Sequence, residues 1–256
     1  MLWTLNSGEP VSTAALPRVL VSVATYNERD NVAALVREIH GQVPAADVLV
    51  VDDNSPDGTG VLVDEMAAAD PRVHCLHRTG KLGLGTAILA AMRYALDHDY
   101  DWLVNMDADF SHHPRYLPAL LAGMKRHDVM IGSRYVPGGG VVNWPASRRL
   151  MSAGVNTMVR LLLRIPAHDT SGSYRCYRVA KLRQTDLKHL LSRGYSFQQE
   201  VLYRCRKAGS SIGETPIIFE NRRAGASKVN PREAIRSIAV LLSVGVQSLF
   251  GLDKAA

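Results

Sequence analysis

Cysteine and aromatic residues are scarce in this sequence. Its 256 residues include three cysteines, at positions 75, 176 and 205, and no two of them have CxxC spacing. An odd number of unpaired cysteines argues against a disulfide framework or a zinc knuckle and favours a reducing compartment. Aromatic residues make up 6% of the chain, too few to suggest a platform on which the bases of single-stranded nucleic acid stack.

The sequence also lacks a long apolar run. The longest uncharged stretch, residues 237–252 (SIAVLLSVGVQSLFGL), is shorter than the roughly 18 residues that a membrane-spanning helix needs, and it contains serine and glutamine. We expect it to form a core helix or a helix at a membrane interface. The first residues show no basic stretch followed by an apolar core, so no signal peptide is expected.

Charge and hydrophobicity are those of a globular protein with a moderate basic excess. Hydrophobic residues make up 46% and charged residues 21%, which excludes disorder and fibrous repeats as the main state. Thirty Lys and Arg against 24 Asp and Glu give a net charge of +6. This excess suits phosphorylated substrates, acidic lipid or nucleic acid. Without a basic stripe or a stacking motif, nucleic acid is not an expected partner.

Short apolar runs alternate with segments of helical spacing. Strands are expected at 19–25, 47–53, 73–77, 102–106 and around 130–131, and helices at 31–42, 61–69, 85–96 and 147–163. Asp30 or Asn31 is the expected N-cap of the first helix. The alternation predicts a parallel sheet with right-handed crossovers, whose active site lies beyond the carboxyl ends of the strands.

Charged residues follow nearly every expected strand. Asp107 and Asp109 flank Ala108 directly after the fourth strand. On extended backbone, two carboxylates one residue apart point to the same side, so both can reach one hard cation. Such an ion can neutralise the charge that grows on a leaving nucleotide diphosphate. A solvated turn is the alternative interpretation of this pair.

Two further patterns belong to the first half of the chain. Asp52 and Asp53 end the second strand, and we expect one to cap the following turn and the other to contact a ribose or base. The stretch 80–85 (GKLGLG) has the spacing GxxGxG. It therefore matches neither a dinucleotide-binding fingerprint nor a P-loop, although such a loop can form an anion cradle at a helix start.

Several ordered motifs together resemble glycosyltransferase family 2, and within it the dolichyl-phosphate (polyprenyl-phosphate) mannose synthases. They span about residues 18–230 and read ATYNE (24–28), DDNSPDGT (52–59), GKLGLGTA (80–87), MDADFSHHP (106–114), IGSRY (131–135), NWP (143–145), DTSG (169–172), GYSFQ (194–198) and RRAGASK (222–228). One such motif is weak, but the ordered set is specific.

The resemblance implies a GT-A fold, a Rossmann-like three-layer α/β sandwich with a mixed, mainly parallel sheet. It also implies a GDP-mannose donor, a polyprenyl-phosphate lipid acceptor and Mg or Mn. The residues carried over as donor-binding are Tyr26, Glu28, Val51, Asp53, Asp107, Ala108, Asp109, Arg222 and Lys228. Those for the acceptor phosphate are Arg134, Arg148 and Ser152. The metal ligands would be Asp107, Asp109 and Ser111, and the catalytic residues Asp107, Asp109 and Arg134.

The predicted organisation is a flexible segment at 1–17, a GT-A catalytic domain at 18–230 and a C-terminal helix at 231–256 that can lie at a membrane interface. We expect a peripheral enzyme on the cytoplasmic face of a membrane. It would bind the membrane through its own surface or through a small membrane subunit. Its reaction would be an inverting transfer of mannose from GDP-mannose to a dolichyl or undecaprenyl phosphate. Alternatives are transfer of glucose or another hexose from a UDP- or GDP-sugar, and a non-catalytic sugar-nucleotide-binding subunit.

Overall fold

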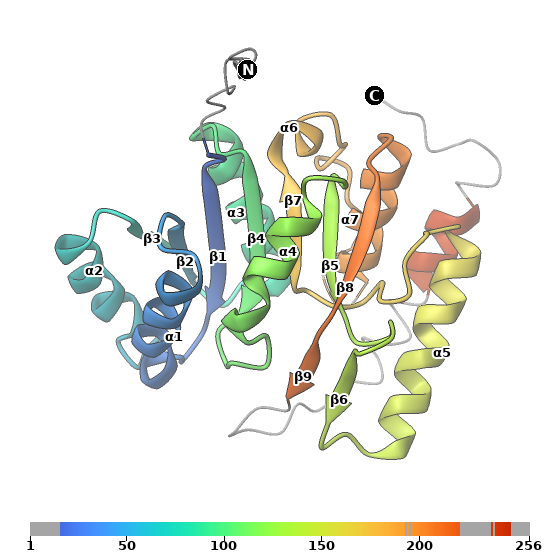
Figure 1. Ribbon diagram of the computed structural model, residues 1–256, viewed down its shortest axis with the longest axis horizontal. Helices are drawn as coiled ribbons and strands as arrows, with labels where there is room; N and C mark the ends of the chain where they lie inside the picture. The colour runs from blue at the N-terminus through green and yellow to red at the C-terminus, as the bar shows by residue number, and fades with distance from the viewer. Residues whose placement is uncertain (1–15, 193, 195, 221–236, 238, 247–256) are drawn as a thin grey trace, which may run out of the picture.

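The computed structural model describes residues 16–192, 194, 196–220, 237 and 239–246. In this part of the chain a seven-stranded sheet has the order β3-β2-β1-β4-β7-β5-β8 (Figure 1). Its strands are β1 (Val19–Thr25), β2 (Asp47–Asp52), β3 (Val73–His77), β4 (Trp102–Asp107), β5 (Val129–Ser133), β7 (Arg175–Arg178) and β8 (Ile212–Pro216). A separate two-stranded sheet pairs β6 (Gly140–Val142) with β9 (Ile218–Glu220).

The sheet is mixed and mainly parallel, as the sequence predicts. Strand β1 runs parallel to both β2 and β4, β2 runs parallel to β3, and β5 runs parallel to β8. Strand β7 is antiparallel to both of its neighbours, β4 and β5. The loops after β1, β2 and β4 therefore lie at one edge of the sheet, where the start of β7 also arrives.

Helices cover both faces of the sheet (Figure 1). They are α1 (Arg29–Gln42), α2 (Thr59–Ala69), α3 (Leu84–Asp97), α4 (Leu117–Gly123), α5 (Ala146–Leu162), α6 (Val179–Leu182) and α7 (Phe197–Lys207), with the 3₁₀ turn η1 (Pro114–Tyr116). The predicted bounds of β1 and β3 are confirmed. The predicted cap of α1 is wrong, because Glu28 occupies the N-cap position and makes no side-chain capping hydrogen bond.

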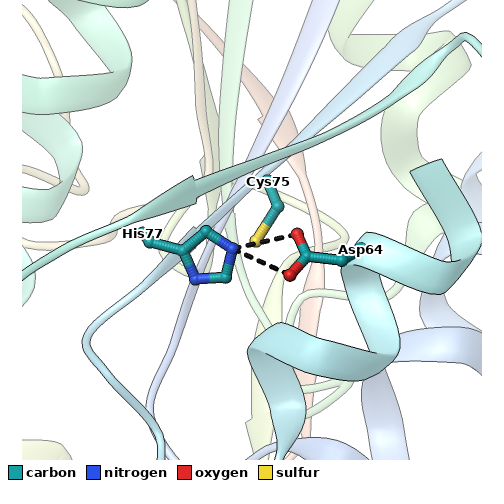
Figure 2. Close-up of side chains that lie close together, drawn as sticks. All are labelled: Asp64, Cys75 and His77. Atoms are coloured by element: carbon teal, nitrogen blue, oxygen red, sulfur yellow. Dashed lines mark hydrogen bonds and ion pairs between the residues drawn. The ribbon is translucent and has the colours of Figure 1, made fainter. Parts of the chain in front are cut away.

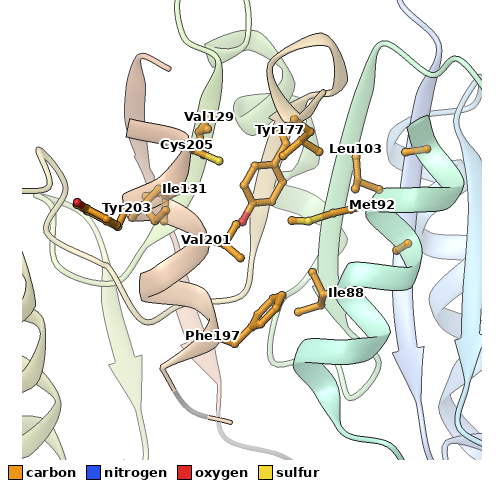
Figure 3. Packing of buried hydrophobic residues seen from close by; sticks show 14 of the residues in the cluster. Ile88, Met92, Leu103, Val129, Ile131, Tyr177, Phe197, Val201, Tyr203 and Cys205 are labelled. Carbon is orange, nitrogen blue, oxygen red and sulfur yellow. The ribbon is translucent and has the colours of Figure 1, made fainter. Parts of the chain in front are cut away.

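Alternation along the strands builds two hydrophobic cores, one on each face. In β1, Leu20 faces one core, whereas Val21 and Val23 face the other, because successive side chains of a strand point to opposite sides. In the first core, Phe197 and Val201 of α7 pack toward α3 (Figure 3). Buried on both faces, the central strands hold the loops at their ends in fixed positions.

The described C-terminal residues continue the first core. Residues 239–246 are helical, and Leu241 and Val244 join the same core cluster as Val159 and Leu163. Of the helices that the structure describes, none has the length and hydrophobicity to cross a membrane. The predicted flexible segment lies, except for its last two residues, outside the described residues, as does most of 231–256.

Candidate active site

Asp107 ends strand β4 and is held by groups from two other segments. Because β7 is antiparallel to β4, the residue opposite Asp107 is Ser173, whose hydroxyl donates a hydrogen bond to Asp107 Oδ1 at 2.9 Å. The Asp107 side chain is 25% exposed. The sheet register thus orients one carboxylate at the carboxyl end of a central strand while leaving it open to a ligand.

Asp109 lies in the turn that follows. Ser111 donates both its hydroxyl and its backbone N–H to Asp109 Oδ1, at 2.5 and 3.1 Å. Between them Phe110 has φ of +62°, a left-handed conformation that is unfavourable for a bulky residue. Strain of this kind is concentrated at functional sites. The turn brings the Asp109 carboxylate and the Ser111 hydroxyl together, and both are oxygen ligands of the kind that a hard cation prefers.

His112 supports this turn from the buried side. The backbone N–H of Asp107 donates to His112 Nδ1 at 3.2 Å, so this nitrogen carries no proton. Burial lowers the pKa of His112, outweighing the nearby carboxylates of Asp107 and Asp109. The 3.4 Å approach of Nδ1 to Asp107 Oδ2 is therefore not an ion pair. The neutral ring stacks on Tyr174, with ring centroids 5.1 Å apart, and its role here is structural.

Asp52, the last residue of β2, and Asp53, which follows it, have different hydrogen-bond partners. Asp52 accepts hydrogen bonds from the backbone and hydroxyl of Ser55 and from Thr25 Oγ1, which confirms a capping role for one of the pair. Asp53 pairs with Arg78 at 2.7 Å and accepts from the backbone N–H of Leu82 and Gly83 at 3.0 and 3.2 Å. Asp53 therefore fastens the glycine-rich loop, in addition to any contact with a nucleotide.

Tyr26 and Glu28 lie in the loop after β1. The ammonium group of Lys81 lies 4.1 Å from the centre of the Tyr26 ring, so the glycine-rich loop and the β1 loop meet across a cation–π contact. Glu28 donates its backbone N–H to Thr59 Oγ1 and accepts from Asn31 through its side chain. The candidate donor residues of the first three strands thus form one continuous rim.

Arg134 follows β5 and is almost completely enclosed. Its Nε and one terminal nitrogen donate to the two oxygens of Asp169, both at 2.7 Å, and the same terminal nitrogen donates to Ser171 Oγ at 2.9 Å. Burial alone would raise the pKa of Asp169, but the charge of Arg134 and four hydrogen bonds hold it below its ordinary value. Asp169 belongs to the DTSG motif, but the sequence alone gives no sign that it pairs with Arg134.

The indole of Trp144 brings the predicted acceptor arginines together. The guanidinium carbons of Arg134 and Arg148 lie 5.4 and 3.9 Å from the centre of the Trp144 ring. Nearby, Tyr135 donates its hydroxyl to Ser152 Oγ at 2.6 Å. All three predicted acceptor residues therefore lie around the start of α5.

Phe219 of β9 joins the acceptor side to the carboxylate side. Its ring lies edge-on to both His112 and Trp144, at centroid distances of 5.3 and 5.6 Å, and the guanidinium of Arg134 lies 5.6 Å from its centre. Sequence reasoning missed this residue, because β9 pairs only with the short strand β6 and no motif marks it. The carboxylates and arginines are thus neighbours within one site.

Two of the predicted donor residues are buried in the cores, and two lie outside the described residues. Val51 is fully buried in the first core, and its contact with a base stays a prediction. Ala108 is buried in the second core, which leaves only its backbone for a ligand. Arg222 and Lys228 fall in a stretch that the structure does not describe.

The donor set at the end of β4 fits a divalent cation. Asp107, Asp109 and Ser111 offer carboxylate and hydroxyl oxygens, the hard ligands that Mg²⁺ and Mn²⁺ prefer. Two carboxylates also leave most of an octahedral coordination sphere for water and substrate phosphates, which is the usual arrangement for Mg²⁺.

Sequence comparisons identify the family. The family model described as glycosyl transferase family 2 matches residues 20–185. The chain belongs to glycosyl transferase family 2. A polyprenol monophosphomannose synthase from Mycolicibacterium smegmatis is 46% identical over 236 residues, covering 90% of this chain and 89% of that protein. An undecaprenyl-phosphate mannosyltransferase from Micrococcus luteus is 46% identical over 213 residues, covering 83% and 88%.

Solved structures support the fold. Glucosyl-3-phosphoglycerate synthase from Mycobacterium tuberculosis, in complex with phosphoglyceric acid, superposes with a TM-score of 0.62 at 17% identity, covering 89% of this chain and 79% of that one. The same enzyme with Mg²⁺ and uridine diphosphate gives a TM-score of 0.61 at 17% identity, with coverages of 89% and 79%. The fold of this family 2 chain is the GT-A fold that the motifs imply.

Proposed function

We propose that this protein transfers mannose from GDP-mannose to a polyprenyl phosphate with inversion, giving a polyprenyl β-D-mannosyl phosphate. The observation that carries the proposal is the site around Phe219, whose ring contacts both His112, beside the carboxylate of Asp107, and the guanidinium of Arg134. It occurs in a chain 46% identical, over nine-tenths of its length, to a polyprenol monophosphomannose synthase.

On the donor side, the chain's own residues orient the nucleotide. Tyr26, Glu28 and the loop fastened by Asp53 form the rim that would receive GDP. Asp107, Asp109 and Ser111 would hold Mg²⁺ or Mn²⁺, which when bound supplies positive charge for the diphosphate leaving group. Ser173 keeps Asp107 oriented toward that position, so little reorganisation is needed when the donor binds.

On the acceptor side, the main task is to bring two anionic substrates together. A phosphate monoester is mostly a dianion at neutral pH, because its second pKa is about 6. It is already a nucleophile, so no general base is required. Asp169 offsets the charge of Arg134, and Arg148, whose guanidinium lies on the Trp144 ring beside it, adds a second positive charge for the phosphate. Attack from the face opposite GDP gives inversion.

Arg148→Ala is therefore expected to weaken acceptor binding selectively. Loss of a charge-assisted hydrogen bond costs about 1.5–3 kcal/mol, which corresponds to a rise of roughly tenfold or more in the KM for polyprenyl phosphate. The KM for the donor should change little. Arg93→Ala, which removes an exposed arginine from α3, is the matched control. Equal increases in both KM values would contradict the acceptor role of Arg148.

The acceptor's lipid tail requires contact with a bilayer. We propose a peripheral position on the cytoplasmic face of a membrane, reached by the protein's own surface or through a small membrane subunit. Support comes from exposed apolar residues on α5, the helix that also carries Arg148: Leu150 is 77% and Leu161 is 73% exposed. The apolar side chains thus begin beside the acceptor residues.

The direct test is a turnover assay with a panel of donors. Radiolabelled GDP-mannose, a short polyprenyl phosphate and Mg²⁺ or Mn²⁺ should yield labelled lipid that partitions into organic solvent. UDP-glucose and GDP-glucose, offered under the same conditions, test the alternative hexose donors. Preferential use of either would replace the mannosyl assignment, and absence of turnover with every donor would favour a non-catalytic binding subunit.

A further inference from the structure

Three metal-ligating side chains gather at the outer edge of the sheet, apart from the candidate active site. Cys75 and His77 lie two residues apart on the edge strand β3, so their side chains point to the same face. Helix α2 brings Asp64 over this face (Figure 2). The three residues thus come from two elements whose relative position is set by core packing.

The ligand atoms are close together. His77 Nε2 lies 2.9 and 3.1 Å from the two carboxylate oxygens of Asp64. The ligand atoms of Asp64, Cys75 and His77 all lie within 4.8 Å of one another. Among the residues that the structure describes, no other group of three His, Cys, Asp or Glu side chains meets this spacing. Small rotamer changes would bring the atoms to metal–ligand distances of about 2.0–2.3 Å.

The surroundings keep the site formed and accessible. A Cβ at Gly60 would lie 2.9 Å from His77 Cε1, so only glycine at this position of α2 lets the imidazole lie where it does. Cys75 is partly buried, whereas the side chains of His77 and Asp64 are 53% and 54% exposed. An ion can therefore enter from solvent, and the open side leaves room for a water ligand.

We propose that Asp64, Cys75 and His77 bind a Zn²⁺ ion, with water as the fourth ligand. Thiolate, imidazole and carboxylate together form a mixed set that suits Zn²⁺ and other borderline transition metals, whereas Mg²⁺ and Ca²⁺ prefer oxygen alone. The oxygen ligands at the end of β4 have the opposite preference. The edge site is independent of the transferase reaction proposed above and would tie β3 to α2.

Cobalt substitution tests the site directly. Co²⁺ added alone to the metal-free protein should give a near-ultraviolet thiolate-to-cobalt absorption band that saturates at one ion per chain and disappears when Zn²⁺ is added. Co²⁺ held by Asp107 and Asp109 cannot produce this band, since it requires sulfur. The other two cysteines, Cys176 and Cys205, are buried in the cores.

Matched variants assign the ligands. Cys75→Ser should abolish the band. His77→Gln should weaken Zn²⁺ binding by at least about tenfold, because loss of a residue that only supports a metal ligand already lowers metal affinity about 10- to 100-fold. His74→Gln is the control, because His74 lies on the other face of the same strand, with its ring centroid 6.0 Å from that of Tyr94. It should bind Zn²⁺ like the unmodified protein.

Thermal unfolding gives a readout that needs no activity. Zn²⁺ that binds only the folded state raises Tm, so it should raise the Tm of the unmodified chain and of His74→Gln by more than that of Cys75→Ser, in which only the oxygen ligands at the end of β4 remain. Metal-free unfolding of each variant checks that it is folded. No sulfur band at stoichiometric Co²⁺, or unchanged Zn²⁺ affinity in folded Cys75→Ser and His77→Gln, would show that the cluster is an ordinary surface ion pair beside a thiol and would overturn the proposal.

Discussion

At the scale of single residues, the site depends on carboxylates whose orientation is set by neighbours. Asp109 accepts from the hydroxyl and backbone of Ser111, and its turn contains a strained Phe110. We expect Asp109→Ala to lower kcat/KM by at least about 10²-fold, close to 3 kcal/mol of barrier, because the cation and the diphosphate lose a shared anchor. Lipid extraction after incubation with labelled donor measures the effect.

Removal of the metal is the complementary experiment on the same residue. Excess chelator should abolish turnover of the unmodified protein, and Mg²⁺ or Mn²⁺ should restore it. Asp97→Ala, an exposed carboxylate in the last turn of α3, should remain fully active. Near-normal turnover of Asp109→Ala, or activity that persists in chelator, would remove the basis for the metal role.

The buried pair of Asp169 and Arg134 should affect the free energy of unfolding and its dependence on pH. Asp169→Asn leaves Arg134 enclosed without its counter-ion, which typically costs about 3–5 kcal/mol of unfolding free energy. The pKa of Asp169 is lowered in the folded state, below the roughly 3.9 of an unfolded chain. Its stabilisation is therefore complete above about pH 4 and is lost as the pH falls through the folded pKa.

Urea unfolding between pH 7 and pH 3 measures this difference. The gap between the unmodified protein and Asp169→Asn should be constant near neutrality and should narrow on acidification below about pH 4. Asp97→Asn, which alters an exposed carboxylate, should show no such gap. A difference that stays the same down to pH 3 would mean that the ionised form of Asp169 contributes nothing through Arg134.

At the scale of elements, α3 and α7 are packed too closely to accept an added methyl group. A Cβ at Gly85 would lie 2.8 Å from Phe197 Cγ. Overpacking of this kind costs about 1–3 kcal/mol, so Gly85→Ala should lower the midpoint of denaturant unfolding. Phe197→Leu in the same chain should recover part of the loss, since the smaller side chain can move aside.

The matched control is Gly80, in the loop that precedes α3. A Cβ at Gly80 would meet no heavy atom within 4 Å, so Gly80→Ala should leave the unfolding midpoint nearly unchanged. If Gly85→Ala were equally neutral, or if the losses from Gly85→Ala and Phe197→Leu simply added, the two helices would not be in the tight contact that the packing indicates.

The helices and strands also show which features of the fold can be predicted from the sequence and which cannot. Strand β1 follows directly from its apolar run, because buried parallel strands carry such runs without alternation. The start of α1 was predicted wrongly, since Asp30 has the residue type of a cap while the backbone turns at Glu28. Contacts between distant segments leave no local pattern. The pairing of Asp169 with Arg134, 35 positions apart, and the placement of Phe219 are of this kind.

At the scale of the whole molecule, the net charge of +6 and the exposed face of α5 favour an anionic bilayer. Leu150 and Leu161 are separated by three helical turns and therefore lie on one face, and arginines 149, 160 and 164 are exposed nearby. A basic residue at such a surface contributes about 1 kcal/mol of binding, and burial of a leucine about 1.5–3 kcal/mol.

Flotation with vesicles tests this surface in the intact chain. The protein should float with vesicles rich in anionic lipid, less so at high salt, and little with neutral ones. Leu150→Asp with Leu161→Asp should lower the bound fraction at least about tenfold, since two buried leucines are lost. Val61→Asp, which changes an aliphatic residue 59% exposed on α2, at the opposite end of the molecule (Figure 1), should float normally. Equal flotation of all three proteins would exclude α5 as the membrane contact, and failure of the unmodified chain to float would mean that a membrane subunit brings the enzyme to its lipid.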